Sequence, residues 1–510
     1  MSEILKLGTR RSLLATIQST WVARQIEGLN PNVKVELVGI ETQGDRITDI
    51  PLHQMDGKEF FVAELDQALL SEKVDFTVHS LKDLSLERPD EICLAAIPSR
   101  ENPRDAIVFS EKILDKLRAG RTLKIGTSSP RRLENLPAFL EKALPGFSGH
   151  VPSMQWFEIR GNVNTRLKRI LEPENSERHL DAVVLALAGL NRIWADSKGQ
   201  QELKELLHGI RWMVLPLTHC PAAAGQGALA VECRKSDSRA FQIIHKLHDE
   251  STADQILAER KILEDWGGGC HQKFGVTSVY LQEQGHFLLI RGKKPDGSFV
   301  NEIRWNAPIQ PSGQIRAWDG VKFRAEDSLT HKALSHKLPD SFSAVFVAHS
   351  RAFPEGKTIQ EKNPRIWTSG VSSWFRLAKE GIWVEGCAEG FGFDFLRPTL
   401  KAPALQLPSF EDWLILTHED AGDGWPVGQV ISTYRVEHAM QENSLVKESL
   451  EKATHVFWGS SSQFDTFGEW VNPDACHSTG PGKTGRYLRE KGIRNLKIFP
   501  SVEEWRKWLN

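Results

Sequence analysis

Residues 4–42 read ILKLGTRRSLLATIQSTWVARQIEGLNPNVKVELVGIET, and this stretch sets the fold class. Its first apolar run, ILKLGTR, is typical of a strand that ends in a polar turn. Apolar residues then recur at helical spacing, and KVELVGIET predicts a second strand. A strand, a helix and a strand in this order predict an α/β domain with a parallel or mixed sheet.

The same order of elements recurs along the first half of the chain. LKIGTSSPRRLENLPAFLEKAL, WFEIRGNVNTRLKRILE and LDAVVLALAGLNRI each predict a strand, a short turn and a helix. The pattern changes after VECRKSDSR, where ADQILAERKILEDW predicts a helix and GHFLLIRGKKPDGSFVNEIRW a hairpin turning at Asp296-Gly297. This later segment predicts a small α+β domain.

The composition restricts where the protein works and what it binds. The chain has 510 residues, too many for one core, and a net charge of -2 gives no overall field for nucleic acid or an anionic membrane. We find no secretion signal and no apolar run of bilayer length, so we expect a cytoplasmic protein. The six cysteines lie far apart without a CxxC pair, which predicts no disulfide framework and no metal site.

Arginines stand beside hydroxyls or glycine at three of the predicted junctions between strand and helix. These junctions are GTRRS at 8–12, GTSSPRR at 126–132 and RGNVNTR at 160–166. Free N–H groups at a helix start and a guanidinium fork together form a strong anion site. The junctions predict a ligand with several carboxylates or phosphates at one sheet edge, although arginines there can also be solvated or cap neighbouring elements.

Two further stretches carry reactive side chains. DFTVHSLKDLS places His79, Ser80, Lys82 and Asp83 directly after a strand, where an aspartate steers protons or holds a cationic nitrogen, or merely caps a turn. EDWGGGCHQ places Cys270 after three glycines, which let a bulky group approach closely. Cys270 is therefore either a carrier of a covalent group or a small buried side chain.

Taken in order, several motifs resemble those of the hydroxymethylbilane synthase (porphobilinogen deaminase) family, over about residues 4 to 305. They are GTRRS, GDRITDIPL, GKEFFVAEL, VHSLKDL, RENPRDA, GTSSPRR, RGNVNTR, LALAGLNR, AAGQGALAVECR and GGGC. The resemblance implies a transferase of porphyrin and haem biosynthesis that joins four porphobilinogen molecules head to tail with loss of ammonia. It also implies a dipyrromethane cofactor on a cysteine, which by motif is Cys270.

The resemblance also implies a role for each matching residue. Asp83 matches the catalytic aspartate, which stabilises the pyrrole nitrogens and the cation formed when ammonia leaves. The implied cofactor-binding residues are Cys270, Ser80, Lys82, Thr127, Ser128, Ser129, Arg131 and Arg132. The implied substrate-binding residues are Arg10, Ser12, Lys58, Arg160, Arg166 and Arg192.

The expected fold is α/β, with two domains like those of periplasmic binding proteins, a small α+β cofactor domain and a C-terminal α/β region. The expected bounds are 1–103 plus 212–230, 104–211, 231–308, a linker at 309–340, and 341–510. Gln43, Leu84-Ser85, Asn164 and Lys273 depart from the family pattern, which bears on substrate affinity and on the loop that holds the cofactor. We expect a monomer without nucleic-acid or membrane partners.

The last region resembles segments of the uroporphyrinogen-III synthase family. The matching stretches are SGVSSWFRLAKEGIWVEGCAEGFGFDFL, YRVE, THVFWGSSSQFDTF and CHSTGPGKTGRYLREKGIRNLKIFPS. One alternative is therefore a bifunctional enzyme that also closes the tetrapyrrole ring. Another, of a different class, is a module that binds a carboxylated ligand without catalysis.

Overall fold

The computed structural model of the chain describes residues 3–42, 62–147, 151–268, 272–281, 284–320, 329–354, 358–421, 425, 428–438 and 444–510. It is a mixed α/β protein with several sheets, and the fold class expected from the sequence is confirmed at this level. In this part of the chain, no helix combines the length and apolar character needed to cross a bilayer.

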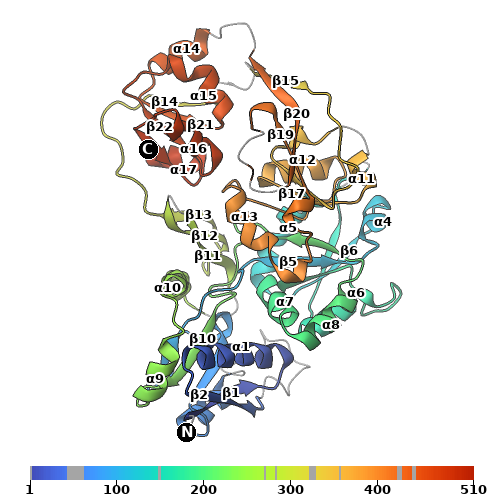
Figure 1. Cartoon of the computed structure of the whole chain (residues 1–510), viewed down its shortest axis with the longest axis vertical. Coiled ribbons are helices and arrows are strands. Elements are labelled where there is room, and N and C mark those ends of the chain that lie inside the picture. Colours follow the sequence, from blue (N-terminus) through green and yellow to red (C-terminus); the bar gives the residue numbers. More distant parts are fainter. Residues whose placement is uncertain are drawn as a thin grey trace.

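The first lobe contains the sheet β2-β1-β3-β10-β4 and begins with the strand, helix and strand predicted from residues 4–42 (Figure 1). β1 pairs in parallel with β2 and β3, whereas β10 runs antiparallel to β3 and β4. Leu5 and Leu7 of β1 pack against Val22 and Ile26 of the first helix in the core. The elements are β1 (Glu3–Arg10), α1 (Leu13–Leu29), β2 (Val33–Ile40), α3 (Ala63–Leu70), β3 (Phe76–Ser80), η2 (Leu81–Asp83), β4 (Ile92–Ala96), β10 (Leu229–Arg234) and α9 (Ser238–His245).

The second lobe contains the sheet β7-β6-β8-β5-β9. β6 pairs in parallel with β7 and β8, so the turns that follow these strands meet at one edge. Pro130 at the first turn suits the start of a helix, where no N–H is needed. The elements are β5 (Asp105–Phe109), α4 (Ile113–Arg118), β6 (Leu123–Gly126), α5 (Pro130–Ala143), β7 (Met154–Phe157), α6 (Val163–Leu171), β8 (Ala182–Ala186), α7 (Leu187–Trp194), α8 (Ser197–Leu206) and β9 (Arg211–Val214).

The chain crosses between these lobes twice, at residues 97–104 and again at residues 215–228, because β4 and β10 lie in the first sheet and β5 and β9 in the second. We call these segments the first and second crossings. The lobes therefore differ from the expected bounds. The second lobe extends to residue 214, because β9 (211–214) pairs in its sheet. The first lobe includes residues 231–245, which were expected in the third domain.

The third lobe is small, as the helix and hairpin pattern predicts. Helix α10 packs on the sheet β11-β12-β13, and Asp296 accepts hydrogen bonds from both the N–H and the hydroxyl of Ser298 at the predicted turn. Gly297 has φ +84, a left-handed conformation that favours glycine. The elements are α10 (Glu250–Asp265), β11 (Lys273–Leu281), β12 (Gly285–Lys293) and β13 (Phe299–Trp305).

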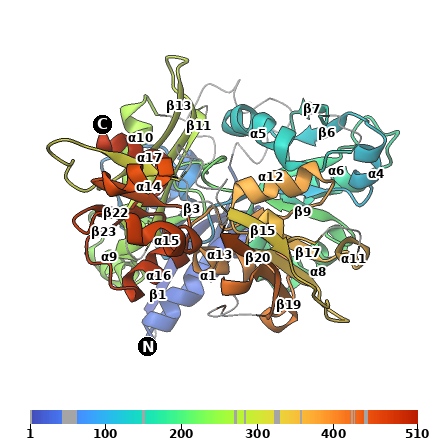
Figure 2. The same ribbon diagram turned by 90° about the horizontal axis from the view of Figure 1, so that it is seen from above.

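The tail forms two lobes that lie side by side when viewed from above (Figure 2). The inner tail lobe has the sheet β15-β20-β19-β16-β17-β18, and the outer tail lobe has the sheet β14-β21-β22-β23. The inner elements are β15 (Leu329–Ala333), β16 (Ala344–Val347), α11 (Thr358–Glu361), β17 (Arg365–Thr368), α12 (Val371–Lys379), β18 (Gly386–Cys387), α13 (Phe393–Leu400), β19 (Trp413–His418) and β20 (Gln429–His438). The outer elements are β14 (Ala317–Asp319), α14 (Ser444–Glu451), β21 (His455–Trp458), α15 (Ser461–Phe467), β22 (Cys476–Thr479), α16 (Lys483–Glu490), β23 (Leu496–Ile498) and α17 (Val502–Leu509). The expected linker at 309–340 therefore contains two strands, each of which joins one of the tail sheets.

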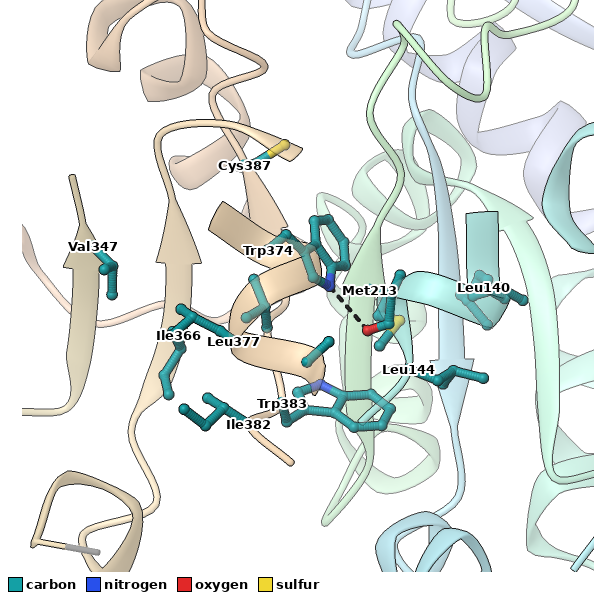
Figure 3. Close-up of a cluster of buried hydrophobic side chains, with 14 of the residues drawn as sticks. Leu140, Leu144, Met213, Val347, Ile366, Trp374, Leu377, Ile382, Trp383 and Cys387 are labelled. Carbon is teal, nitrogen blue, oxygen red and sulfur yellow. Dashed lines mark hydrogen bonds between the residues drawn. The ribbon is translucent and has the colours of Figure 1, made fainter. Parts of the chain in front are cut away.

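The inner tail lobe shares a hydrophobic core with the second lobe (Figure 3). The indole N–H of Trp374 donates to the carbonyl of Ala143 at 3.0 Å, and that of Trp383 donates to the carbonyl of Trp212 at 3.0 Å. Leu140 and Met213 of the second lobe lie in the same cluster. Because buried indoles satisfy their N–H groups across the boundary, the two lobes pack as one body.

Candidate active site

A cavity of about 700 Å³ opens between the first and second lobes, and most of the predicted site residues that the structure describes line it. The first lobe supplies residues that end β1 and β3 or lie on α1. The second lobe supplies residues that follow β7 and β8 or lie on α5, α6 and α7. The predicted residues in the lining are Arg10, Ser12, Ser80, Lys82, Asp83, Arg132, Arg160, Arg166 and Arg192.

Parallel strand ends bring the first-lobe residues together. Arg10 and Ser80 are the last residues of β1 and β3, which pair in parallel. Gln18 of α1 donates from Nε2 to the hydroxyl of Ser80 at 3.1 Å and thereby fixes this hydroxyl at the cavity wall. Nothing in the sequence marks Gln18 as a site residue, because its partner lies 62 positions away.

The second lobe supplies guanidinium groups that face the cavity. Burial and, to a smaller extent, the positive charge of Arg132 lower the pKa of Arg166 to about 10. Burial likewise lowers the pKa of Arg192 to about 10. Nη2 of Arg160 is buried without a hydrogen-bond partner among the described residues. Cations that are desolvated, crowded and unpaired favour an anionic ligand with several charged groups.

Asp83 is the one carboxylate among the described residues that line the cavity. It closes the short helix η2, and its side chain is exposed. The adjacent Lys82 has a lowered pKa because of burial, an effect that the charge of Asp83 partly opposes. Arg260 of α10 donates to the carbonyls of Leu84 at 3.1 Å and Ser85 at 2.8 Å, so the third lobe holds the Asp83 segment from behind.

Arg132 is held by a carboxylate outside the cavity. Asp105 is fully buried and accepts from Nη2 of Arg132 at 2.7 Å, while Nη1 of Arg131 lies 2.8 Å from its other oxygen. Gln226 of the second crossing also donates to Asp105, at 2.9 Å. Asp105 and Gln226 were missed because the motifs that contain them, RENPRDA and AAGQGALAVECR, show no sign of their distant partners.

Some of the expected cofactor residues do not line the cavity. The hydroxyl of Ser128 donates to the carbonyl of Ile159 at 2.7 Å, and Thr127 is buried and accepts from the N–H of Ser129 at 3.3 Å. Arg131 is buried against Asp105 and donates to the carbonyl of Pro221 at 2.8 Å. These contacts form the turn before α5 and support the neighbouring Arg132.

Cys270 and Lys58 lie outside the described residues, as does Gln43. Gly268 and Gln272, the described residues that flank 269–271, contact each other: Nε2 of Gln272 donates to the carbonyl of Gly268 at 2.7 Å. Gly268 has φ +63, and a Cβ built on it would lie 3.1 Å from Cδ1 of Leu86, just beyond the Asp83 segment. Gly268 thus permits a left-handed turn and a close approach to Leu86 of the first lobe.

A second group of titratable side chains lies within the first lobe, away from the cavity lining. Asp66, His79 and Glu232 offer atoms within 4.8 Å of one another. Arg88 donates to Asp66 at 2.6 Å and to Glu232 at 2.8 Å, and burial together with the nearby arginines lowers the pKa of His79 to about 3. A guanidinium group therefore already neutralises these carboxylates, and we read the group as a buried ion network.

A cleft between two α/β lobes, with several guanidinium groups around one carboxylate, defines a protein that handles a polycarboxylate ligand. Comparison with known proteins identifies the family within this class. Residues 5–242 match the family model described as "Porphobilinogen deaminase, dipyromethane cofactor binding domain". The chain belongs to the porphobilinogen deaminase family.

Curated relatives support this membership. The porphobilinogen deaminase of Bacillus subtilis (strain 168) is 37% identical over 302 residues, covering 59% of this chain and 87% of the relative. That of Bacillus velezensis is 39% identical over 299 residues, covering 58% and 86%. That of Brevibacillus brevis is 36% identical over 313 residues, covering 61% and 92%. The predicted transferase class, the hydroxymethylbilane synthase function and the dipyrromethane cofactor are confirmed.

Solved structures add little to this comparison. The BenM effector binding domain with its effector benzoate covers 52% of this chain and 95% of that chain, with 13% identity and a TM-score of 0.27. We draw no conclusion from a likeness this low.

Proposed function

We propose that the cavity between the first and second lobes is where porphobilinogen molecules are joined, and that Asp83 is the catalytic residue. The observation that supports this proposal most directly is the arrangement of charge. One carboxylate stands among the cations of Arg10, Lys82, Arg132, Arg160, Arg166 and Arg192, which line the same cavity.

The guanidinium groups bind the substrate through its acidic side chains. Each porphobilinogen carries an acetate and a propionate, and arginine binds carboxylates through two parallel hydrogen bonds. Arg10 and Ser12 engage these groups from the first lobe, and Arg160, Arg166 and Arg192 engage them from the second. Lys58 is proposed for the same role from its motif alone. Substrate bound by both lobes is held in a fixed orientation next to Asp83.

Asp83 acts on the positive charge that develops as ammonia leaves. Its carboxylate oxygens accept hydrogen bonds from the pyrrole N–H and lie beside the delocalised cation, which lowers the barrier to bond formation. A preorganised group of this kind typically contributes about 10²–10³ in rate. Lys82 and the surrounding arginines bind the substrate carboxylates beside Asp83.

The described residues fit the dipyrromethane cofactor, which also carries carboxylates. The buried and unpartnered Nη2 of Arg160 and the desolvated Lys82 are the kind of cation that such a group would neutralise. We assign the cofactor to Cys270 as covalent anchor and to Ser80, Lys82 and Arg132, the last three of which line the cavity. Thr127, Ser128, Ser129 and Arg131 are proposed for this role from their motif alone. When bound, the cofactor supplies the nucleophilic pyrrole carbon at which the chain begins.

Asp83→Asn tests the catalytic assignment. This substitution removes the charge but keeps the shape, so kcat should fall about 100-fold or more while the cofactor stays attached by intact mass. Asp90→Asn is the matched control, because Asp90 is exposed on the segment that follows. Normal turnover by Asp83→Asn would contradict the assignment.

A second activity of the tail stays a prediction. β14 pairs in the sheet of its outer lobe and β15 in that of its inner lobe, and Nζ of Lys483 in the outer lobe lies 3.6 Å from the ring centre of Trp425 in the inner lobe. Incubation with porphobilinogen and separation of the uroporphyrinogen isomers decides between the two possibilities: type III shows ring closure by the tail, and type I alone shows that the tail does not close the ring.

We also propose that the enzyme is a cytoplasmic monomer. Gel filtration with light scattering tests the monomer, and cell fractionation tests the location.

A further inference from the structure

The two crossings between the first and second lobes are bonded to each other. Arg100 of the first crossing donates from Nε to the carbonyl of Gln226 in the second, at 2.8 Å. The N–H of Glu101 donates to the carbonyl of Gly227 at 3.1 Å, and Nε2 of Gln226 donates to the carbonyl of Pro103 at 2.6 Å. Any change in the angle between the two lobes has to pass through this pair of segments.

A single carboxylate of the tail contacts both crossings. Oε1 of Glu389 accepts from Nη2 of Arg104 in the first crossing at 2.7 Å, and Oε2 accepts from the backbone N–H of Thr218 in the second at 2.7 Å. The side chain of Glu389 is 0% exposed and that of Arg104 is 6% exposed. Because both oxygens are used and water is excluded, this carboxylate ties the crossings together more firmly than a surface ion pair would.

The backbone around Glu389 is unusual. Glu389 has φ +59, a left-handed conformation that a residue with a side chain adopts at a cost, and Gly390 next to it has φ +81. The same turn places Phe391 against Phe287 of the third lobe, with ring centres 5.4 Å apart, and Phe395 5.0 Å from the guanidinium of Arg104. The turn therefore lies where the crossings, the third lobe and the inner tail lobe meet.

The second crossing ends in the wall of the cavity. Gln226, Gly227 and Ala228 all line it. Arg192 donates from Nη2 to the carbonyl of Gly227 at 2.7 Å. A shift of the second crossing thus changes both the wall and the position of a guanidinium group that faces the ligand.

We propose that Glu389 is a positioning residue for the polymerisation reaction. By holding Arg104 and the N–H of Thr218 on one carboxylate, it fixes the ends of both crossings next to the second lobe and, through the second crossing, the cavity wall at Gly227 and the guanidinium of Arg192. This inference rests on the proposed role of the cavity. It gives the tail a part in the reaction of the first three lobes that does not depend on any chemistry in the tail.

The variants that test this proposal are Glu389→Gln and Glu389→Asp in the full-length, cofactor-loaded enzyme. Glutamine keeps the size but loses the charge that Arg104 requires, and aspartate keeps the charge but is too short to reach both partners. Asp394→Asn is the control, because Asp394 is five positions away, is 67% exposed and pairs with Arg397 in the helix that follows. If Glu389→Gln does not fold, the same measurements on Glu389→Asp test the proposal.

Three readouts separate positioning from a merely structural contact. In Glu389→Asp we expect hydrogen exchange at the Thr218 amide to speed up at least about tenfold, because the shorter side chain takes the acceptor away from this N–H. We expect KM for porphobilinogen to rise about tenfold with kcat changed less than about threefold, because binding needs both lobes whereas Asp83 sits in one. Intact mass after limited substrate should show a changed distribution of enzyme-bound pyrrole chains.

Faster amide exchange with unchanged KM and an unchanged distribution of bound chains would overturn the proposal and leave Glu389 as a docking contact. Equal effects in Asp394→Asn would also overturn it. If the unsubstituted enzyme releases no ammonia from porphobilinogen, the proposed function fails, and that result is separate from the exchange measurement on Glu389.

Discussion

Asp105 lies directly beneath Arg132, and its Oδ1 accepts a hydrogen bond from Nη2 of Arg132 at 2.7 Å with both side chains buried. Asp105 opens β5 at the end of the first crossing, whereas Arg132 reaches from α5 into the cavity wall. A carboxylate that never meets the ligand thus determines where one of the cavity cations stands.

Asp105→Asn should destabilise the protein strongly. The substitution leaves the buried guanidinium groups of Arg131 and Arg132 without a counter-charge, and loss of one partner of a buried pair typically costs about 3–5 kcal/mol. The free energy of unfolding from chemical denaturation measures this loss. Asp115→Asn is the control, since Asp115 is 77% exposed and its pair with Arg118 lies at the surface. Equal stability of the two variants would contradict the structural role of Asp105.

The same pair predicts how stability depends on pH. Desolvation raises the pKa of Asp105, but the charges of Arg131 and Arg132 outweigh it and hold the pKa below the ordinary value. A carboxyl group with a lowered folded-state pKa contributes its full stability above the unfolded pKa of about 3.9 and loses it as the pH falls further. We therefore expect the stability difference between the unsubstituted protein and Asp105→Asn to be constant from pH 5 to 7 and to shrink below about pH 4. A difference that disappears near pH 6 would show that another group is responsible.

Arg160→Gln should weaken substrate binding without lowering stability. Nη2 of Arg160 has no partner among the described residues, so its removal breaks few internal bonds. A charged hydrogen bond to a substrate carboxylate is worth about 1.5–3 kcal/mol, which corresponds to a rise in KM of about 10-fold to 150-fold. Steady-state kinetics and a thermal melt measure both effects. Arg121→Gln, at a side chain that is 67% exposed, should leave KM unchanged.

Trp374→Ala should loosen the tail from the second lobe. Trp374 is fully buried, and its ring centre lies 5.2 Å from that of Phe139 in the shared core. Truncation of a buried tryptophan typically costs about 3–5 kcal/mol. We expect faster proteolysis between the two lobes and a lower unfolding temperature, with Trp21→Ala as control because Trp21 is 38% exposed on α1. Unchanged proteolysis would mean that the two lobes do not depend on this core.

The sequence predicts the parts of this protein that local pattern encodes. The strand, helix and strand at residues 4–42 follow from apolar spacing, and the positions of Arg10 and Ser80 follow because parallel strands end at one edge. The prediction that the glycines before Cys270 let a bulky group approach stays a prediction, because Cys270 lies outside the described residues.

Long-range partners are what the sequence does not encode. Asp105 pairs with Arg132 across 27 positions, and Glu389 pairs with Arg104 across 285 positions, so no local spacing points to either contact. β14 was expected to be part of the linker, because three residues are too few to show an alternation of apolar and polar side chains. It becomes a strand by pairing with β21. Asn164, which departs from the family glycine, is explained by the structure: it is buried on α6 and donates to Glu202 of α8 at 2.6 Å.

Cys270 is proposed to carry the dipyrromethane cofactor, and Asp83 to act in the cavity between the first two lobes. Intact-mass measurement of the purified, active protein tests it most directly, with Cys270→Ser and Cys93→Ser compared side by side. We expect the unsubstituted protein and Cys93→Ser to be heavier than their sequences by one dipyrromethane, and Cys270→Ser to have the bare mass and no activity. An active protein with the bare mass of its sequence would contradict the claim.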